Sequence, residues 1–308
     1  MNCSEVPKLP VSELSEEKFL TDYVARNQPL IVTGALEDWD IPHVWTPRAL
    51  EKRFGDQLVQ VYDNYFTLQS IMPLRQYLAD NFGRETVNTG KLPYVRWYTK
   101  LREVEFCWAD DTFNQLKDQW MAPTFLPDSK YLLPHTSEDE KISPVTDLFP
   151  AKGLFISPRG ARTSLHVDPW GSCAVLCQLY GTKRWYFYGP EQAQYLQNES
   201  GTVDVTRPDM RKFPSFSMAR LFATCRLGPG DVVYIPHGWF HQVECESDSV
   251  SLTWNFVHRT TQASFVAWLT DGCLSEFDES VLRFFYRIAP GRRVVDDVLA
   301  RLQDRRVA

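Results

Sequence analysis

The sequence predicts a mainly β protein in which a β-barrel core carries helical flanks. From about residue 153 to 258 the chain consists of short apolar runs separated by turn signals, which is typical of an all-β sandwich or barrel. The residues before this stretch mix helical and strand patterns, and the residues after it return to helical periodicity. With no internal repeat or low-complexity linker, we expect an N-terminal helix and strand region (1–152) packing on a core (153–258), followed by a helical segment (259–308).

Composition indicates a soluble globular chain. Its 308 residues are 44% hydrophobic and 23% charged, enough apolar material for a large core. The net charge of −6 provides no global field for a polyanion, which weighs against nucleic acid as a partner. The seven cysteines are an odd number without zinc-type CxxC spacing, so they are expected to be buried thiols rather than a disulfide framework.

Targeting signals are not evident in the sequence. No run of about 18 apolar residues occurs, and the first residues lack the basic and then apolar layout of a secretory signal. We therefore expect an intracellular protein, cytoplasmic or nuclear, without membrane association.

In the N-terminal region the sequence predicts three helices and a strand. Ser15 is a candidate N-cap for a helix over 16–26, because acidic residues follow in its first turn. The β-branched run in "QPLIVTGALEDW" predicts a strand that enters a turn. Further helices are expected at 47–54, with proline at the first helical position, and at 72–82.

The segment 106–150 is aromatic-rich and punctuated by prolines, so we expect an irregular excursion over the sheet. The core strands are then expected in "GLFIS", "SCAVLCQLYG", "KRWYFYG", "ATCRLGPG", "DVVYIPHG", "HQVECE" and "VSLTWNFV". After residue 259 helices are expected in "QASFVAWLTDGCL", "DESVLRFFYRIA" and "VVDDVLARLQ".

The stretch "RTSLHVDPWGS" places His166 two residues before Asp168. On a strand, residues i and i+2 point to the same face, so both side chains could reach one metal ion. An H-x-D triplet alone is weak evidence, since most such pairs are surface or capping residues.

A second signal lies in "GDVVYIPHGWFHQVE", where a strand ends at His237 and His241 opens the next strand. Two imidazoles and one carboxylate on one face of an octahedral ion form the facial triad of non-haem Fe(II) oxygenases. His237 is the other candidate in this loop, but it precedes a glycine at a turn, so His241 is preferred. Taken alone, a half-buried histidine beside Trp239 and Phe240 would be the simpler interpretation.

Three motifs, "HVD", "GTKRWYFYGPEQ" and "GDVVYIPHGWFHQVE", resemble those of the JmjC-domain family in order and spacing. This family comprises cupin-type dioxygenases that depend on Fe(II) and 2-oxoglutarate. The resemblance is densest over 153–258, and "PLIVTGALEDW" resembles the opening of the hydroxylase-type members. It implies that the β core is a double-stranded β-helix, the jelly roll of the cupin superfamily.

The resemblance also implies the roles of individual residues. The family's iron ligands correspond to His166, Asp168 and His241, and its 2-oxoglutarate lysine corresponds to Lys183 in "GTKRW". A lysine suits this role because the distal carboxylate of the cosubstrate is a buried anion that needs a cation. The plain alternative for Lys183 is a surface lysine on a strand.

Further cosubstrate contacts follow from the same resemblance. Thr163 matches a hydroxyl that helps to hold the distal carboxylate, and a tyrosine in "PYVRWYTK", Tyr94 or else Tyr98, matches another contact. Asn255 matches an asparagine that related hydroxylases place near the metal, although a plain core position is equally compatible. Leu176 occupies a position inside the barrel where some relatives carry a polar residue.

The implied reaction consumes 2-oxoglutarate and O2, releases succinate and CO2, and hydroxylates a C–H bond. Asp168 fills the position that related halogenases leave open for chloride, so halogenation is disfavoured. Hydroxylation and N-methyl-lysine or arginine demethylation differ only in the C–H bond presented. The compact chain without a histone-reader module favours hydroxylation, as does "RPDMRKFPSF" (207–216), which resembles the N-P-D and F-P-x-F insert of hydroxylase-type members with Arg207 in place of the asparagine.

The expected substrate is a protein or peptide side chain, because the aromatic and acidic excursion at 106–141 could form a cleft wall. A modified tRNA base or a small metabolite is the alternative, while a non-catalytic cupin binding module would require a lost ligand. The resemblance allows a homodimer through the C-terminal helices. Their apolar residues would suit either dimerisation or packing on the barrel: Val294, Val295, Val298, Leu299 and Leu302. The arginines of this tail alternate with aspartates and indicate a solvated helix face.

Overall fold

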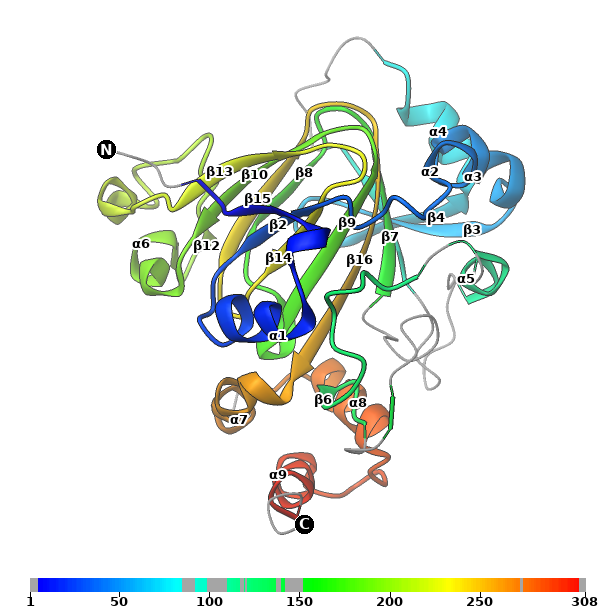
Figure 1. The fold of residues 1–308 in the computed structure, drawn as a ribbon. Helices are drawn as coiled ribbons and strands as arrows, with labels where there is room; N and C mark the ends of the chain where they lie inside the picture. The colour runs from blue at the N-terminus through cyan, green and yellow to red at the C-terminus, as the bar shows by residue number, and fades with distance from the viewer. Residues whose placement is uncertain are drawn as a thin grey trace.

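Two sheets packed face to face form the core of the computed structural model (Figure 1). The structure describes residues 5–84, 92–98, 110–116, 119, 121–136, 140–141, 152–271 and 274–304. Eight strands make the core: β7 (Lys152–Ser157), β8 (Arg162–His166), β9 (Cys173–Tyr180), β10 (Lys183–Tyr188), β13 (Ala223–Leu227), β14 (Val232–Ile235), β15 (Phe240–Cys245) and β16 (Ser249–His258). In the described residues a small sheet has the order β13-β10-β15-β8, and it faces the β14-β9-β16-β7 part of a larger sheet. This arrangement confirms the predicted jelly-roll core with flanking helices.

Strand alternation gives the large sheet two different faces. On β16 the side chains of Val250, Leu252 and Trp254 are fully buried in the cluster on the outer side of the barrel. Ser251 lies on the opposite face of β16, toward the small sheet, where its hydroxyl contacts Lys183. The barrel interior is therefore partly polar at this place, which a purely structural core does not require.

The N-terminal strands extend the large sheet at both edges. Strands β1 (Lys8–Pro10) and β2 (Leu30–Thr33) add beside β14, while β5 (Tyr94–Tyr98), β3 (Leu58–Tyr62) and β4 (Leu68–Pro73) add beside β7. Helices α2 (Ile41–Val44), α3 (Pro47–Phe54) and α4 (Leu74–Asn81) lie on this extension. The predicted helices at 47–54 and 72–82 are confirmed, the second beginning two residues later.

The predicted helix over 16–26 is divided. Ser15 caps α1 (Glu16–Lys18) by accepting a hydrogen bond from the Lys18 amide, as expected, but a π-helical turn (Phe19–Val24) follows. Phe19 and Val24 are both buried and stand five residues apart. The wider turn places both on the core-facing side, whereas an α-helix would bring residues four apart into line.

The C-terminal helices close the end of the barrel at the bottom of Figure 1. They are α7 (Gln262–Thr270), α8 (Glu276–Tyr286) and α9 (Val294–Asp304), and β6 (Tyr131–Leu133) pairs with β16 beside them. Val294, Val298 and Leu302 are buried against residues of α7 and α8. Packing within one chain therefore accounts for the apolar stripe of α9, and a dimer through it stays a prediction.

Part of the predicted excursion at 106–150 lies outside the described residues. Its described parts include α5 (Asp110–Leu116) and a buried stretch around Phe125 and Leu126. Where the chain is described, Cys173, Cys177, Cys225 and Cys245 are free thiols. None of the described helices is long and apolar enough to cross a membrane.

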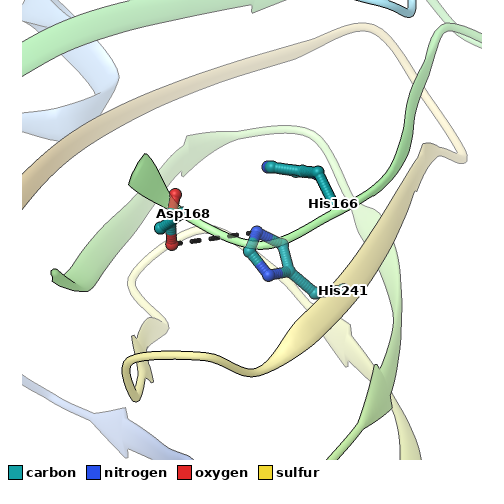
Figure 2. A group of neighbouring side chains, drawn as sticks. All are labelled: His166, Asp168 and His241. Carbon is teal, nitrogen blue, oxygen red and sulfur yellow. Dashed lines mark ion pairs between the residues drawn. The ribbon is translucent and has the colours of Figure 1, made fainter. Parts of the chain in front are cut away.

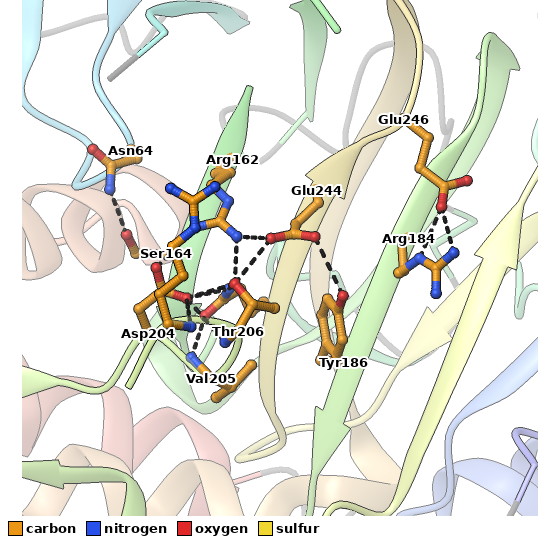
Figure 3. A network of polar contacts seen from close by, with 12 residues as sticks. Asn64, Arg162, Ser164, Arg184, Tyr186, Asp204, Val205, Thr206, Glu244 and Glu246 are labelled. Atoms are coloured by element: carbon orange, nitrogen blue, oxygen red, sulfur yellow. Dashed lines mark hydrogen bonds and ion pairs between the residues drawn. The ribbon is translucent and has the colours of Figure 1, made fainter. Parts of the chain in front are cut away.

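An insert between β10 and β13, residues 189–222, attaches to the outer face of the small sheet (Figure 3). It contains the short helix α6 (Ala193–Leu196) and the two-stranded β11 (Gln197–Asn198) and β12 (Gly201–Thr202). Arg162 on β8 donates to the Asp204 carboxylate at 2.8 Å and also contacts Thr206 and Glu244. Arg162 thus joins the insert to the strand that carries His166.

Arg162→Met is expected to lower the free energy of unfolding by about 1–2 kcal/mol, because Asp204 and Glu244 would lose their shared cation in a half-buried place. Urea denaturation would measure the loss. Arg184→Met is the matched control, since Arg184 is more exposed and its partner Glu246 keeps Arg226. Equal losses in the two variants would contradict a special role for Arg162.

Candidate metal centre

Three side chains converge at one end of the barrel: His166, Asp168 and His241 (Figure 2). One ligand atom from each lies within 4.8 Å of the others. His166 ends β8 and faces His241 on β15 as its cross-strand partner, with ring centroids 4.2 Å apart. A register shift follows His241 on this ladder, an irregularity that often re-aims side chains at functional sites.

Asp168 reaches the site by a turn rather than by strand alternation. Strand β8 ends at His166, so the argument that residues i and i+2 share a strand face does not apply to Asp168. A short 3₁₀ turn (Pro169–Gly171) follows, in which Trp170 has φ 63° and Gly171 has φ 58°. Asp168 itself has extended backbone between the strand and this turn, and its Oδ2 atom lies 4.0 Å from His241 Nε2.

The donor atoms fit a divalent metal ion. The Nδ1 atoms of His166 and His241 lie 2.8 and 3.2 Å from backbone carbonyls, which can only accept. Each Nδ1 therefore carries the proton, and each Nε2 keeps a lone pair for a ligand bond. Within the described part of the chain, the Asp168 Oδ2 atom is buried without a hydrogen-bond partner. A buried carboxylate oxygen beside two imidazoles needs a cation, so the three residues fit the facial triad.

The pKa of His166 lies well below its ordinary value. Burial is the largest cause, and electrostatic interactions with His241 and Arg96 lower the pKa further. The imidazole is therefore neutral at pH 7, which is the form that binds a metal. On the other side, the Trp185 ring stacks on His241 at a centroid distance of 5.7 Å and limits the positions that this imidazole can take.

Lys183 is buried inside the barrel, 3% exposed, so the surface alternative is wrong. Its Nζ donates to the Ser251 hydroxyl of the facing sheet at 2.7 Å. No described acidic side chain pairs with it, and burial lowers the pKa of its amine. A buried cation with only a neutral partner is costly to the fold, and an anionic ligand would offset that cost.

Tyr94 and Thr163 meet near Lys183. The Thr163 hydroxyl lies 3.4 Å from the Tyr94 phenol oxygen. Tyr94 packs with Cys245, which is the cross-strand partner of Lys183. The structure thus brings these predicted cosubstrate residues to one region of the barrel interior. The side chain of Tyr98 lies outside the described residues.

The remaining candidate positions have the following contacts. The Asn255 amide donates to Ser172 Oγ at 3.1 Å, at the end of the turn that positions Asp168. His237 is not a member of the triad and contacts Ser264 on α7 at 3.2 Å. Leu176 packs in the apolar cluster that contains Trp185.

Two polar residues of the interior were not predicted from the sequence. Ser251 could have been found from the alternation in "VSLTWNFV", which places it on the polar face. Arg96 stands two residues after Tyr94 on β5 and so shares its face, but no local pattern marks it as functional.

Comparisons with known proteins place most of the chain in one family. The family described as a cupin-like domain matches residues 16–262. The chain is 28% identical over 267 residues to tRNA wybutosine-synthesizing protein 5 of Gallus gallus, covering 82% of this chain and 78% of that protein. It is 22% identical over 262 residues to the bifunctional arginine demethylase and lysyl-hydroxylase psr-1 of Caenorhabditis briggsae, covering 82% and 61%.

The 2-oxoglutarate and iron-dependent oxygenase JMJD4 of Gallus gallus is 23% identical over 282 residues, covering 85% of this chain and 62% of that protein. The chain therefore spans about three fifths of the length of some of these relatives. The family match covers most of the chain and includes the strands that carry the triad. This chain belongs to the JmjC group of the cupin-like domain family.

Proposed function

We propose that the chain is an Fe(II)- and 2-oxoglutarate-dependent oxygenase that hydroxylates a C–H bond of a protein or peptide side chain. The observation that carries the proposal is the His166, Asp168 and His241 triad in the same barrel as a buried lysine, Lys183, which has no acidic partner among the described residues. A triad alone could hold many metals, whereas the added cation inside the barrel suits an anionic cosubstrate.

The residues would divide the work as follows. His166, Asp168 and His241 would hold the metal on one face and leave its other positions open. Lys183 would bind the distal carboxylate of 2-oxoglutarate, with Thr163 and Tyr94 donating hydrogen bonds to it. Bound Fe(II) and 2-oxoglutarate would supply the oxidation of the C–H bond by O2, with release of succinate and CO2. Aromatic rings around His241 would keep water out.

The substrate is the finer part of the proposal. The relatives' names include a tRNA-modifying protein, a demethylase and a lysyl-hydroxylase, so the family supports several classes. The net charge of −6 disfavours a nucleic acid, and we therefore place a peptide first. Hydroxylation of a modified tRNA base is the second candidate, favoured by the match to tRNA wybutosine-synthesizing protein 5.

The test is 2-oxoglutarate turnover with separate peptide, tRNA and metabolite pools, followed by mass spectrometry. Stimulation by peptides with the gain of one oxygen atom is expected, whereas loss of a methyl group would contradict hydroxylation. His166→Ala is expected to abolish turnover. His43→Ala is its matched control, because His43 is exposed and contacts only Asp40 among the described residues. Turnover by His166→Ala at the wild-type rate would contradict the enzymatic proposal.

A further inference from the structure

Arg96 is a second cation of the barrel that has no acidic partner among the residues that the structure describes. Its guanidinium carbon lies 3.5 Å from the ring centroid of Phe66, 4.9 Å from that of Phe155 and 5.4 Å from that of Tyr94. Across the described ranges no ion pair or hydrogen bond is made by Arg96, and its Nε atom is buried without a partner. Aromatic faces stabilise a guanidinium, but they leave its N–H groups available for an anion.

Arg96 lies between the two parts of the proposed catalytic site. Phe66, the ring under its guanidinium, meets His166 edge-on with centroids 4.9 Å apart. Both cations lie close to the ring of Phe155: the Arg96 guanidinium carbon is 4.9 Å from the ring centroid and the Lys183 Nζ atom is 5.9 Å from it. The charge of Arg96 is also felt by both His166 and Lys183, since it lowers the pKa of each.

The loop that carries Phe66 is held in a defined shape. Phe66 has φ 65°, a left-handed conformation that costs energy for an aromatic residue. The Asp63 carboxylate accepts two backbone amides of this turn. Asn64 bonds to Ser164 through both its carbonyl and its side chain, which fixes the turn against β8 two residues before His166. The strained turn keeps Phe66 between Arg96 and the metal ligands.

The charges of the metal, Lys183, Asp168 and 2-oxoglutarate already cancel, so Arg96 is not needed to neutralise the cosubstrate. In the proposed complex the two positive charges of Fe(II) and the one on Lys183 balance the one negative charge of Asp168 and the two of 2-oxoglutarate. Arg96 then adds a positive charge that no described side chain neutralises. A partly buried cation at this place favours one further anionic group.

We infer that Arg96 binds a carboxylate of the prime substrate, so that the oxidised residue lies beside an aspartate or glutamate of a peptide. The inference rests on the proposed function and specifies its substrate class. A guanidinium whose face is stacked on Phe66 presents its N–H edge, which matches a carboxylate with two parallel hydrogen bonds. One such cation on a chain of net charge −6 suits a single carboxylate better than a phosphate backbone.

The experiment uses two random peptide libraries with blocked termini, identical except that one has Asn and Gln in place of Asp and Glu. Mass spectrometry measures the rate at which peptides of each library gain one oxygen atom. The wild type is expected to oxidise the acidic library about tenfold or more faster, since a paired carboxylate contributes on the order of 1.4 kcal/mol or more. A third library with free C-termini distinguishes a terminal carboxylate from a side chain.

Variants assign the preference to Arg96. Arg96→Gln is expected to remove the preference, and Arg96→Glu to turn it toward peptides with Lys or Arg. Arg53→Gln is the matched control, because Arg53 also lies over a ring, that of Phe54, but is exposed and donates to the Gln115 carbonyl on α5. It is expected to keep the preference in full.

Two results would overturn the inference. One is equal oxidation of both blocked libraries, or of neither while a tRNA pool is oxidised. The other is a loss of tenfold or more in the affinity of Arg96→Gln for 2-oxoglutarate, measured by calorimetry on the Mn(II)-loaded protein, because Arg96 would then belong to the cosubstrate. If the wild type binds no Mn(II) and forms no succinate, the proposed function itself fails.

Discussion

Asp168→Asn is expected to lower 2-oxoglutarate turnover by about a thousandfold or more, because the three ligands act as a unit. Asparagine keeps the shape of the side chain but removes the negative charge that faces the His241 Nε2 atom at 4.0 Å. The measurements are succinate formation and titration with Mn(II). We expect the affinity for Mn(II) to fall together with turnover.

The expected loss of turnover in Asp168→Asn must be distinguished from unfolding of the variant. In the metal-free protein Asp168 Oδ2 is buried without a described partner, so a neutral amide is expected to leave the thermal midpoint unchanged or higher. Asp209→Asn is the matched control, since the described side-chain contacts of Asp209 lie within its own loop. Normal Mn(II) binding by Asp168→Asn would remove Asp168 from the ligand set.

The convergence of the histidines could be predicted from the sequence. His166 and His241 lie on short runs with strand character, and a jelly roll places such strands side by side. The position of Asp168 had a different origin from the one expected, because Asp168 lies beyond the end of β8, before a turn that contains two left-handed residues, Trp170 and Gly171. No sequence pattern predicts a left-handed conformation for a tryptophan. In the structure this turn packs against α7, a contact that local sequence does not report.

The burial of Lys183 follows from alternation with Trp185, which also points inward, so its direction was predictable. The contact between Arg96 and Phe66 could not be predicted from the sequence. They meet because β3 pairs with β5 and the turn between β3 and β4 docks on β8, which are contacts between segments far apart in the chain. Local periodicity cannot report such contacts. The division of the first helix was missed for a related reason, since a π-helical turn is selected by what Phe19 and Val24 pack against.

Lys183→Met is expected to stabilise the ligand-free protein while removing its response to the cosubstrate. Burial lowers the pKa of Lys183, so the charged amine is less stable in the folded protein than in the unfolded chain. Methionine has a similar length and no charge. We expect the thermal midpoint to rise by about 2–4 °C, as for a gain of about 1 kcal/mol, even after loss of the hydrogen bond to Ser251.

The pH dependence has a definite sign. Because the folded pKa is the lower one, the cost of burying the ammonium is complete at pH values below it and is relieved as the pH rises through it toward the unfolded value. The difference in midpoint between Lys183→Met and the wild type is therefore expected to shrink as the pH rises. If the difference in thermal midpoint grew with pH, the charged amine would be favoured in the folded protein. That result would contradict the expectation drawn from burial and from the absence of an acidic partner among the described residues.

In the presence of 2-oxoglutarate the wild type is expected to be more stable than Lys183→Met. In the wild type loaded with Mn(II), 2-oxoglutarate at a hundred times its Kd adds about 2.7 kcal/mol to stability, and its distal carboxylate supplies the anion that Lys183 lacks. Lys183→Met is expected to show none of this gain. Lys8→Met is the matched control, because Lys8 is exposed and pairs with Asp231 at the edge of the sheet, so it should keep the whole response. A variant that is more stable when empty but unresponsive to 2-oxoglutarate would show that Lys183 is kept for binding at the expense of stability.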